Sequence, residues 1–150
     1  MSLKIIQANL NRNAQATEHT LNLAIDFGVE ILAIQEPWLV NYGRTDDYSS
    51  TRSISHSSFT QILPTYEEKK WRPRAMFYVL KSCRVTISSW AECPHDPDIA
   101  AMVITTGKES FTLLNIYNQK CQSGSSFSTI DRNLNKLHIK SNCILVGDFN

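Results

Sequence analysis

Amide and acidic side chains recur where apolar segments end in this 150-residue sequence. The polar residues at these positions are Asn9, Asn11, Glu36, Asn115, Tyr117, Asn118, Asp148 and Asn150. In α/β proteins, functional side chains collect at strand ends, because the loops there vary over a rigid base. Carboxylate and amide oxygens suit a hard divalent cation that also binds phosphate. The pattern raises the hypothesis of a metal and phosphate site.

Glu36 directly follows a segment that is apolar at nearly every position. A carboxylate there is costly unless a partner compensates its charge. Mg²⁺ is a suitable partner, with Mn²⁺ as an alternative, because it takes one or two carboxylates and completes its shell with water and phosphate oxygens. Asp148, at a matching position, has the chemistry to orient or deprotonate a water molecule.

Each of these residues also has an interpretation without chemistry. A lone glutamate at a strand end, such as Glu36, is commonly a solvated loop residue. Tyr117 fits an ordinary half-buried strand tyrosine. The asparagine and aspartate residues at the other strand ends are common turn formers. Residue types alone leave the two interpretations open.

The elements that must position these residues follow from periodicity. Lys4–Ala8 and Val29–Ile34 are short apolar segments typical of strands. Between them, apolar residues recur at three- and four-residue steps from Ala14 to Ile25, which predicts a helix with Asn13 as its N-cap and Gly28 after its end.

The rest of the chain is mainly β-rich. Further strands are predicted at Arg74–Lys81, Cys83–Trp90, Ile99–Thr106, Phe111–Tyr117 and Asn142–Asn150. A long surface loop is expected over Asn41–Ser58, and a second helix, capped by Ser128, over Thr129–Ile139. This order predicts an α/β fold, with a mixed sheet or a pair of sheets carrying helices outside.

Composition narrows the class of protein. The 42% hydrophobic and 19% charged residues are typical of a globular chain, and no apolar segment is long enough to span a membrane. No two of the four cysteines have C-x-x-C spacing, which argues against zinc sites and thioredoxin-like redox sites. Without a secretory signal, an intracellular location with reduced thiols is expected.

The net charge of +1 does not by itself indicate nucleic-acid binding, but one local cluster is basic. It runs from Lys69 to Arg74, and its candidate nucleic-acid contacts are Lys70, Trp71, Arg72 and Arg74, with Asn118 from a later strand end. Basic groups around an aromatic ring can bind phosphate and stack on a base. The alternative is a solvated loop whose charges Glu67 and Glu68 offset.

Four motifs in order carry a resemblance. They are Gln7-Ala8-Asn9-Leu10-Asn11-Arg12, Ile34-Gln35-Glu36-Pro37-Trp38, Asn115-Ile116-Tyr117-Asn118 and Val146-Gly147-Asp148-Phe149-Asn150. Together they resemble the endonuclease/exonuclease/phosphatase superfamily. Together with the segment Arg72–Val79, the sequences of these motifs resemble the apurinic-type endonuclease domain of non-LTR retrotransposons. The resemblance implies a four-layer α/β sandwich, with two β-sheets face to face and helices outside.

The resemblance also implies roles for individual residues. Glu36 would be the principal Mg²⁺ ligand, with Asn9 and Asn11 on the metal side of the site. The reaction would be in-line hydrolysis of a DNA phosphodiester bond. DNA would be the partner, a reverse transcriptase would share the polypeptide of the full element, and a nuclear location follows only from this resemblance.

The catalytic residues implied by the resemblance are in the second half of the chain. Tyr117 would contact the scissile phosphate, and Asn150 would hydrogen-bond the phosphate oxygens. Asp148 would orient the attacking water or protonate the leaving group.

One departure from the family pattern shapes the expectation of activity. The sequence stops at Asn150, inside the Gly-Asp-Phe-Asn motif, and lacks the family's later Ser-Asp-His-type motif. We therefore expect residues 1–150 to form a single, C-terminally truncated domain with little or no nuclease activity by itself. The alternatives are a non-catalytic remnant that at most binds nucleic acid, and a phosphomonoesterase or inositol-phosphate phosphatase of the same superfamily.

Overall fold

A computed structural model describes residues 2–43, 47–67, 71–119, 128–139 and 141–149 of the chain. Its elements, in chain order, are β1 (Ile5–Asn9), α1 (Ala14–Asp26), β2 (Ile31–Gln35), β3 (Val40–Asn41), the 3-10 turn η1 (Tyr48–Ser50), β4 (Thr51–Arg52), β5 (Phe59–Ile62), β6 (Ala75–Leu80), β7 (Thr86–Ser89), β8 (Ile99–Thr106), β9 (Glu109–Tyr117), α2 (Thr129–Asn133) and β10 (Cys143–Asp148).

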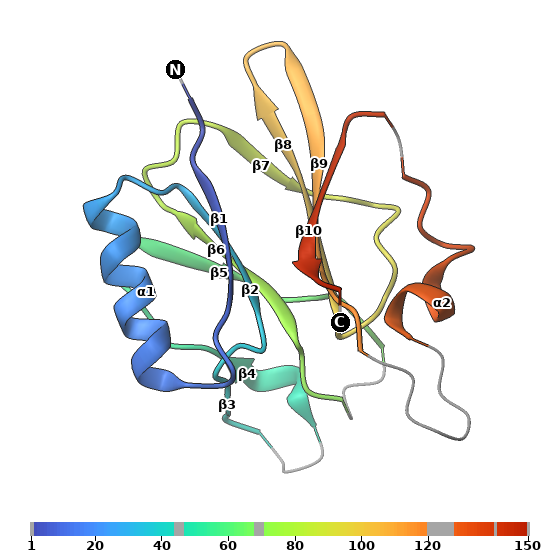
Figure 1. Ribbon diagram of the computed structural model, residues 1–150, viewed down its shortest axis with the longest axis horizontal. Helices are drawn as coiled ribbons and strands as arrows, with labels where there is room; N and C mark the ends of the chain where they lie inside the picture. Colours follow the sequence, from blue (N-terminus) through green and yellow to red (C-terminus); the bar gives the residue numbers. More distant parts are fainter. Residues whose placement is uncertain (1, 44–46, 68–70, 120–127, 140, 150) are drawn as a thin grey trace.

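The strands form two four-stranded sheets and a small hairpin-like pair. The first sheet has the order β1-β2-β6-β5 and the second the order β10-β9-β8-β7, while β3 pairs with β4. β1 and β2 run parallel, as do β9 and β10, and the other neighbours are antiparallel. β1 and β10 therefore edge the two sheets on the same side of the molecule, which is the near side in Figure 1.

Three apolar clusters define the layers. One lies between α1 and the outer face of the first sheet, where Leu21 and Ala24 meet β2 and β6. The second fills the space between the sheets and includes Phe77 and Met102. The third lies on the outer face of the second sheet, where Ile130 of α2 packs. The order α1, sheet, sheet, α2 confirms the predicted four-layer α/β sandwich (Figure 1).

α1 forms where the sequence predicted it. The Asn13 side chain accepts a hydrogen bond from the backbone N–H of Ala16 at 2.9 Å, which caps the helix. One face of α1 buries Thr17, Leu21 and Ala24 against the first sheet. The chain leaves the helix through Gly28, whose φ of +63° favours glycine.

α2 is shorter than the predicted helix Thr129–Ile139. Ser128 does cap it, in a capping box with Asp131. The helix ends at Asn133, whose side-chain amide donates to Asp96 and to the Thr129 carbonyl, so that the following residues form turns instead. Leu134, the first residue after the helix, is 65% exposed.

The segment between β2 and β6 also differs from expectation. The predicted loop Asn41–Ser58 contains the short pair β3 and β4 and the turn η1. β5 follows it and was not predicted, because its four residues carry no clear alternation of polar and apolar side chains. Its pairing with β6 determines it as a strand.

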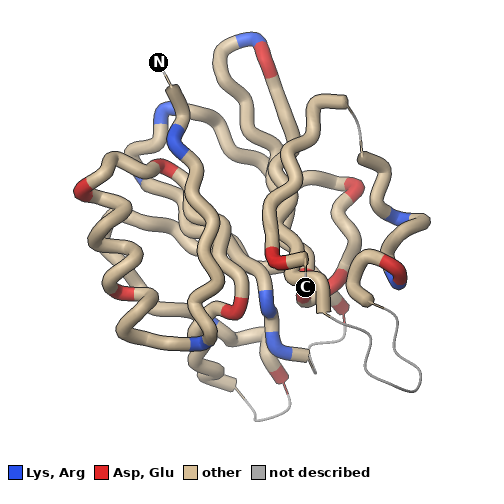
Figure 2. The backbone as a smooth tube through the Cα atoms, viewed as in Figure 1, with Lys and Arg blue, Asp and Glu red and all other residues tan. Residues whose placement is uncertain are grey.

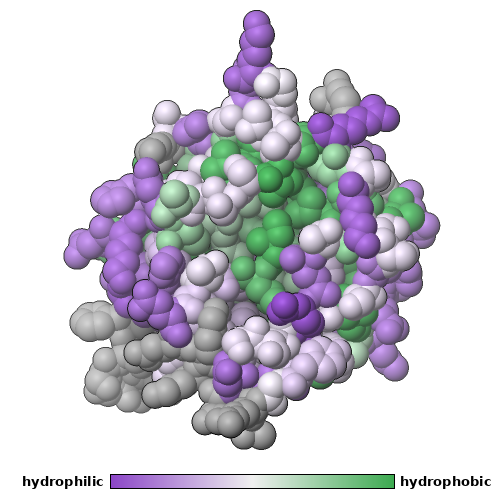
Figure 3. Space-filling model, turned by 180° about the vertical axis from the view of Figure 1, so that it is seen from behind, coloured by the Kyte–Doolittle hydropathy of each residue, from purple (hydrophilic) through white to green (hydrophobic). Residues whose placement is uncertain are grey.

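Both long sides of the sandwich expose apolar residues. On the near side, β1 and β10 carry no charged residue before Asp148 (Figure 2), and Ile6, Ile144 and Leu145 are between 41% and 45% exposed. On the far side a groove of about 450 Å³ separates β5 from β7, and hydrophobic residues gather on this face in Figure 3. No helix in the described part of the chain has the length and apolar character to cross a bilayer.

Candidate active site

The parallel pairing of β1 and β2 brings the first two motifs together. Asn9 is in register with Gln35, so Glu36 follows at the same edge of the sheet. The loops beyond the strands are joined as well: the Leu10 N–H donates to the Gln35 carbonyl at 3.0 Å and the Arg12 N–H to the Glu36 carbonyl at 2.8 Å. These backbone bonds fix Glu36 relative to the loop after β1.

The backbone at this corner has left-handed conformations. Among the described residues other than glycine, positive φ angles occur at Asn11 (+45°), Arg12 (+54°) and Glu36 (+47°), all at the ends of β1 and β2. Such conformations are unfavourable for residues with a Cβ atom and concentrate at functional sites. The strain marks this corner as a candidate site independently of residue type.

The last motif joins this corner from the other sheet. The Asn9 side-chain amide donates to the Asp148 carboxylate at 2.8 Å. Beside it, the Gly147 N–H donates to the Gln7 side-chain oxygen at 2.8 Å and the Gln7 amide donates to the Gly147 carbonyl at 3.4 Å, so three hydrogen bonds connect β1 and β10. Asn9 uses its own oxygen to accept the Asn11 N–H at 2.9 Å, which fixes the orientation of its amide toward Asp148.

A buried amide pair holds the two sheets together beneath the site. The Gln35 side chain donates to the Asn115 side-chain oxygen at 2.5 Å, and the Asn115 amide donates to the carbonyls of Ile34 and Met76 at 2.9 Å each. Asn115 is fully buried. A satisfied buried network of this kind fixes relative position, so Asn115 supports the site from below rather than facing it.

Tyr117 lies beside both carboxylates. Burial, a hydrogen bond to Glu36, and the charges of Glu36 and Asp148 raise the pKa of Tyr117 to about 12, against a smaller opposing effect of Arg74. The hydroxyl is therefore protonated at neutral pH and able to donate a hydrogen bond. The Arg12 guanidinium approaches Glu36 at 3.7 Å from the exposed side.

Arg74 is placed over the ring of Tyr117, 5.3 Å from its centroid. It is held there by Asp98, which accepts hydrogen bonds from Arg74 Nε and Nη2 at 2.6 Å each. Asp96 pairs in the same way with Arg132 of α2, at 2.7 and 2.8 Å. Burial alone would raise the pKa of Asp96, but hydrogen bonds from Arg132, Asn133 and the Asp98 backbone hold it below the ordinary value.

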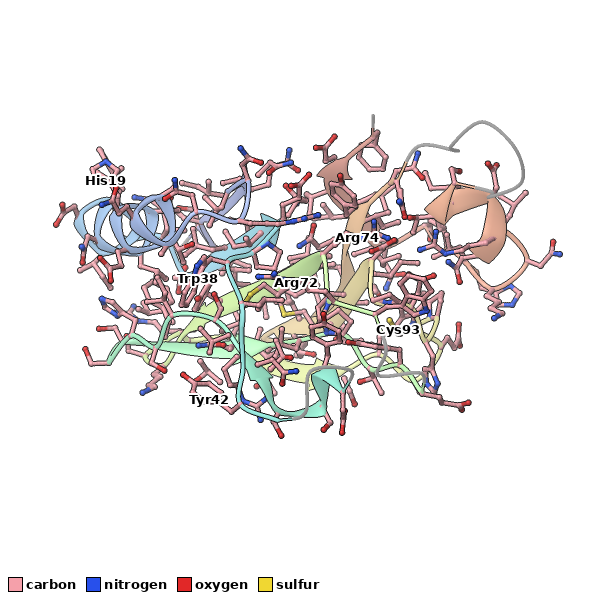
Figure 4. The ribbon with its side chains drawn as sticks, turned by 90° about the horizontal axis from the view of Figure 1, so that it is seen from below. His19, Trp38, Tyr42, Arg72, Arg74 and Cys93 are labelled. Atoms are coloured by element: carbon pink, nitrogen blue, oxygen red, sulfur yellow. The ribbon has the colours of Figure 1, made fainter. Side chains whose placement is uncertain are left out.

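A large open groove adjoins these residues. Its volume is about 1210 Å³. The Lys and Arg residues that line it are Arg12, Arg72, Arg74, Arg132 and Lys136, and the acidic residues are Glu67, Glu92 and Asp96. Trp71, 63% exposed, also lines it. Figure 4 shows Arg72 and Arg74 between α1 and α2, with Cys93 nearby. The groove thus begins at Arg12 and Arg74, beside the carboxylate corner, and extends to Lys136 and His138 after α2; Glu36 and Asp148 are not among its lining residues.

Arg72 is partly buried in the wall of this groove. Its Nη2 donates to the Leu39 carbonyl at 3.0 Å, while its buried Nε has no hydrogen-bond partner. Burial, followed by the charge of Arg12, lowers the pKa of Arg72. Among the described residues of the basic cluster, Arg72 and Arg74 are therefore held by contacts with the rest of the protein.

Comparison with known proteins decides the fold. No protein-family model matches the chain, and no curated protein matches its sequence. A solved structure does match: the endonuclease domain of TRAS1, a telomere-specific non-LTR retrotransposon, with a TM-score of 0.69 at 18% identity. This chain has the fold of that endonuclease domain. The match covers 98% of this chain and 58% of the TRAS1 domain chain, so it spans a little over half of the known structure.

The endonuclease-domain fold explains which predicted residues meet. Asn9, Glu36, Tyr117 and Asp148, from four strand ends in two sheets, form one cluster. Asn11 contributes its backbone N–H to Asn9.

Other predicted residues have structural contacts or lie outside the described parts. The Asn118 side-chain oxygen accepts the Ile130 N–H at 3.1 Å, so this side chain serves to position α2. Lys70 and Asn150 lie outside the described residues.

Sequence reasoning missed Arg12, Asp98 and Arg132. Arg12 adjoins a motif residue, and its position after Asn11 was a usable signal. Asp98 and Arg132 carry no local signal, because each acquires its role from a partner more than 20 residues away, 24 residues from Asp98 to Arg74 and 36 from Arg132 to Asp96.

The donor set of the site fits a hard divalent cation. The two carboxylates Glu36 and Asp148 offer oxygen ligands, whereas the Asn9 oxygen accepts the Asn11 N–H and its amide NH2 faces Asp148. In the described part of the chain no three His, Cys, Asp or Glu residues are grouped to hold a metal ion. Mg²⁺ needs no such cage, because it commonly binds through one or two carboxylates and keeps water or phosphate oxygens for the rest of its shell.

Proposed function

We propose that this chain is the motif-bearing portion of a Mg²⁺-dependent endonuclease that hydrolyses DNA phosphodiester bonds in retroelement target-site nicking. The observation that carries the proposal is the convergence of Asn9, Glu36, Tyr117 and Asp148 from two sheets. The likeness to the TRAS1 endonuclease domain supports it at the level of fold.

The residues divide the work as follows. Glu36 and Asn11, with the Asn9 amide, form the metal side of the site. A bound Mg²⁺ or Mn²⁺ would supply positive charge against the developing charge on the phosphate. Asn9 orients the Asp148 carboxylate through their 2.8 Å hydrogen bond.

Tyr117 and Asp148 act on the phosphate and on water. The Tyr117 hydroxyl, protonated at neutral pH, has one hydrogen, which would turn from Glu36 to a phosphate oxygen when a metal ion takes up the Glu36 carboxylate. Asp148 orients the attacking water or protonates the leaving group. Asn150 hydrogen-bonds the phosphate oxygens, by the family resemblance alone.

The groove supplies the surface for DNA. Arg74 and Arg132 in its lining are paired with Asp98 and Asp96, so the lining cations outside these pairs are Arg12, Arg72 and Lys136, and exposed Trp71 offers a stacking face. Lys70 belongs to the same basic segment. By the same resemblance, we propose that the chain acts in the nucleus, in an element whose polypeptide also carries a reverse transcriptase.

We further propose that the 150-residue chain turns over slowly or not at all by itself. None of its four histidines follows Asp148, so the family's late phosphate-binding histidine has no counterpart in this sequence. Metal and DNA binding need only the residues already described, so these two properties remain testable in the chain alone.

The direct test measures metal binding and chemistry separately. We expect Mg²⁺ to raise the melting temperature; at a tenfold excess over its Kd, the stabilisation is about 1.4 kcal/mol. Glu36→Gln and Asp148→Asn should abolish this rise. Glu18→Gln, on the exposed face of α1, is the matched control and should retain it.

Three outcomes would redirect the proposal. Equal Mg²⁺ stabilisation in Glu36→Gln and wild type would refute the metal site. Hydrolysis of a small phosphomonoester without nicking of supercoiled plasmid would favour the phosphatase alternative. DNA binding by a chain whose melting temperature does not rise with Mg²⁺ would favour the non-catalytic remnant.

A further inference from the structure

Asp98 connects three separate parts of the chain. Its carboxylate, on the residue just before β8, is fully buried. It accepts hydrogen bonds from Arg74, from the Thr129 hydroxyl at 2.9 Å, and from Arg132. Arg74 precedes β6, whereas Thr129 and Arg132 belong to α2. One carboxylate therefore links α2 to the edge of the candidate active site.

The geometry of the Arg74 contact is restrictive. Two parallel hydrogen bonds from a guanidinium to a carboxylate fix the plane of the guanidinium as well as its position. The Arg74 backbone is fixed too, because its N–H donates to Pro97 and its carbonyl accepts from Glu36, both at 2.9 Å. Arg74 thus has one orientation, with its charge 5.3 Å from the centre of the Tyr117 ring.

Asp98 also holds Tyr117 directly. The Tyr117 N–H donates to the Asp98 carbonyl at 2.9 Å. The main chain of Asp98 therefore places the tyrosine, and its side chain places the cation over that tyrosine. Both partners of the ring contact depend on this residue.

Asp96 provides an internal comparison. It is two residues earlier, is almost as buried, and pairs with Arg132 and Asn133. Its side chain also accepts the Asp98 N–H at 2.9 Å. Its partners Arg132 and Asn133 lie on α2, and the Asp98 N–H belongs to its own loop, so it stabilises the same cluster without contacting Arg74.

We propose that Asp98 is a positioning residue of the candidate active site: it holds Arg74 over Tyr117 and makes that arrangement depend on the docking of α2. The inference rests on the proposed function for its biological meaning. The arrangement itself concerns this chain's own residues and is testable without DNA, metal or turnover.

The test follows the Tyr117 ring by NMR in protein labelled with ¹³C-tyrosine. The Tyr117 resonance is assigned by its loss in Tyr117→Phe. Arg74→Gln removes the cation and should displace this resonance. Asp98→Asn should displace it in the same direction, and Asp98→Asn combined with Arg74→Gln should cause no further displacement. Glu18→Gln, which neutralises a carboxylate on the exposed face of α1, is the control and should leave the resonance in place.

The result that overturns the proposal is equally definite. If Asp98→Asn leaves the resonance unmoved while Arg74→Gln displaces it, or if the two displacements add, Asp98 does not position Arg74. If Asp98→Asn does not fold by circular dichroism, Arg74→Lys replaces it, since lysine keeps the charge but loses the two-bond pairing. An unmoved resonance in Arg74→Lys would likewise overturn the proposal.

A separate variant tests whether the position of Arg74 over Tyr117 depends on α2. Arg132→Gln leaves Asp98 and Arg74 intact and removes the ion pair to α2. It should displace the Tyr117 resonance in the same direction as Asp98→Asn, by a smaller amount. No displacement would show that α2 is not coupled to the site. Failure of the proposed function would leave all of these spectra unaffected.

Discussion

Two pairs of acidic residues, Asp96 with Asp98 and Glu36 with Asp148, lie on either side of Arg74 and Tyr117 and differ in what compensates their charge. The first pair is buried and accepts two-bond contacts from Arg132 and Arg74. The second pair accepts hydrogen bonds from neutral groups, the Asn9 amide and the Tyr117 hydroxyl. Arg12 approaches Glu36 only to 3.7 Å, from an exposed position.

This difference separates the carboxylates that hold the structure together from those that we propose to act in the reaction. Buried charges persist only when they are paired and hydrogen-bonded, and a pair so satisfied has no remaining demand for an external cation. Glu36 accepts a hydrogen bond from Tyr117 and faces Arg12 at 3.7 Å without a two-bond pairing, so it is the carboxylate that we propose to attract a cation.

The largest expected effect is on the structural pair. Asp98→Ala leaves Arg74 and Arg132 without their shared partner, and breaking a buried ion pair from one side costs about 3–5 kcal/mol of unfolding free energy. Glu36→Ala should cost less than about 1 kcal/mol, as typical for a site not committed to stability. Urea denaturation followed by circular dichroism measures both. Equal losses would remove the distinction between the pairs.

The next largest expected loss of stability is at Gly147, the residue of β10 that precedes Asp148. Gly147 has a φ of +155°, and a Cβ atom added there would lie 2.0 Å from the Ile116 carbonyl oxygen. Gly147→Ala should therefore destabilise the protein by about 3 kcal/mol through strain and displacement of β10. Gly107→Ala is the control: its φ is +60° but nothing lies within 4 Å, so only about 1–2 kcal/mol is expected. Similar losses in both variants would contradict the steric explanation.

The titration of Tyr117 gives a further test of the difference between the two pairs. Its raised pKa, about 12, means that the folded state keeps the proton longer than the unfolded state, whose tyrosine pKa is near 10. The corresponding stability is present below pH 10 and is lost as the pH rises from 10 to 12.

The titration should also identify which carboxylate is responsible. Glu36→Gln should lower the pKa of Tyr117, because it removes the charge of Glu36, whereas Asp96→Asn should leave it unchanged. The absorbance at 295 nm, taken as the difference from Tyr117→Phe, measures this. If the pKa of Tyr117 changed more in Asp96→Asn than in Glu36→Gln, the raised pKa would not be due to Glu36.

The smallest expected effect on stability tests the backbone strain at Glu36. Glu36 has a φ of +47°, so Glu36→Gly should be more stable than Glu36→Ala by about 1 kcal/mol. At Glu18, inside α1, the order should reverse by a similar amount, because glycine disfavours a helix. Thermal unfolding of the four variants provides the comparison. The same order at both positions would exclude strain at Glu36.

Local signals account for the parts of the fold that were predictable. α1 was predictable from its apolar spacing, from Asn13 as N-cap and from Gly28 after its end, and these contacts are within a few residues of each other. β5 and the end of α2 were not, because they depend on pairing with β6 and on the contact of Asn133 with Asp96, 37 residues away. The strand ends that carry the motifs were predicted correctly, whereas the support beneath them was not.

By itself, the sequence determined the chemical types of the site residues and the strand ends on which they lie, since both depend on identity and local periodicity. Only the tertiary structure decided which charges are already paired. Arg74 belonged to a basic cluster in the sequence, but Asp98, 24 residues away, takes up its charge. Asp148 reaches Asn9 across 139 residues. Charge compensation depends on distance in space and on burial, and neither is encoded in the neighbours along the chain.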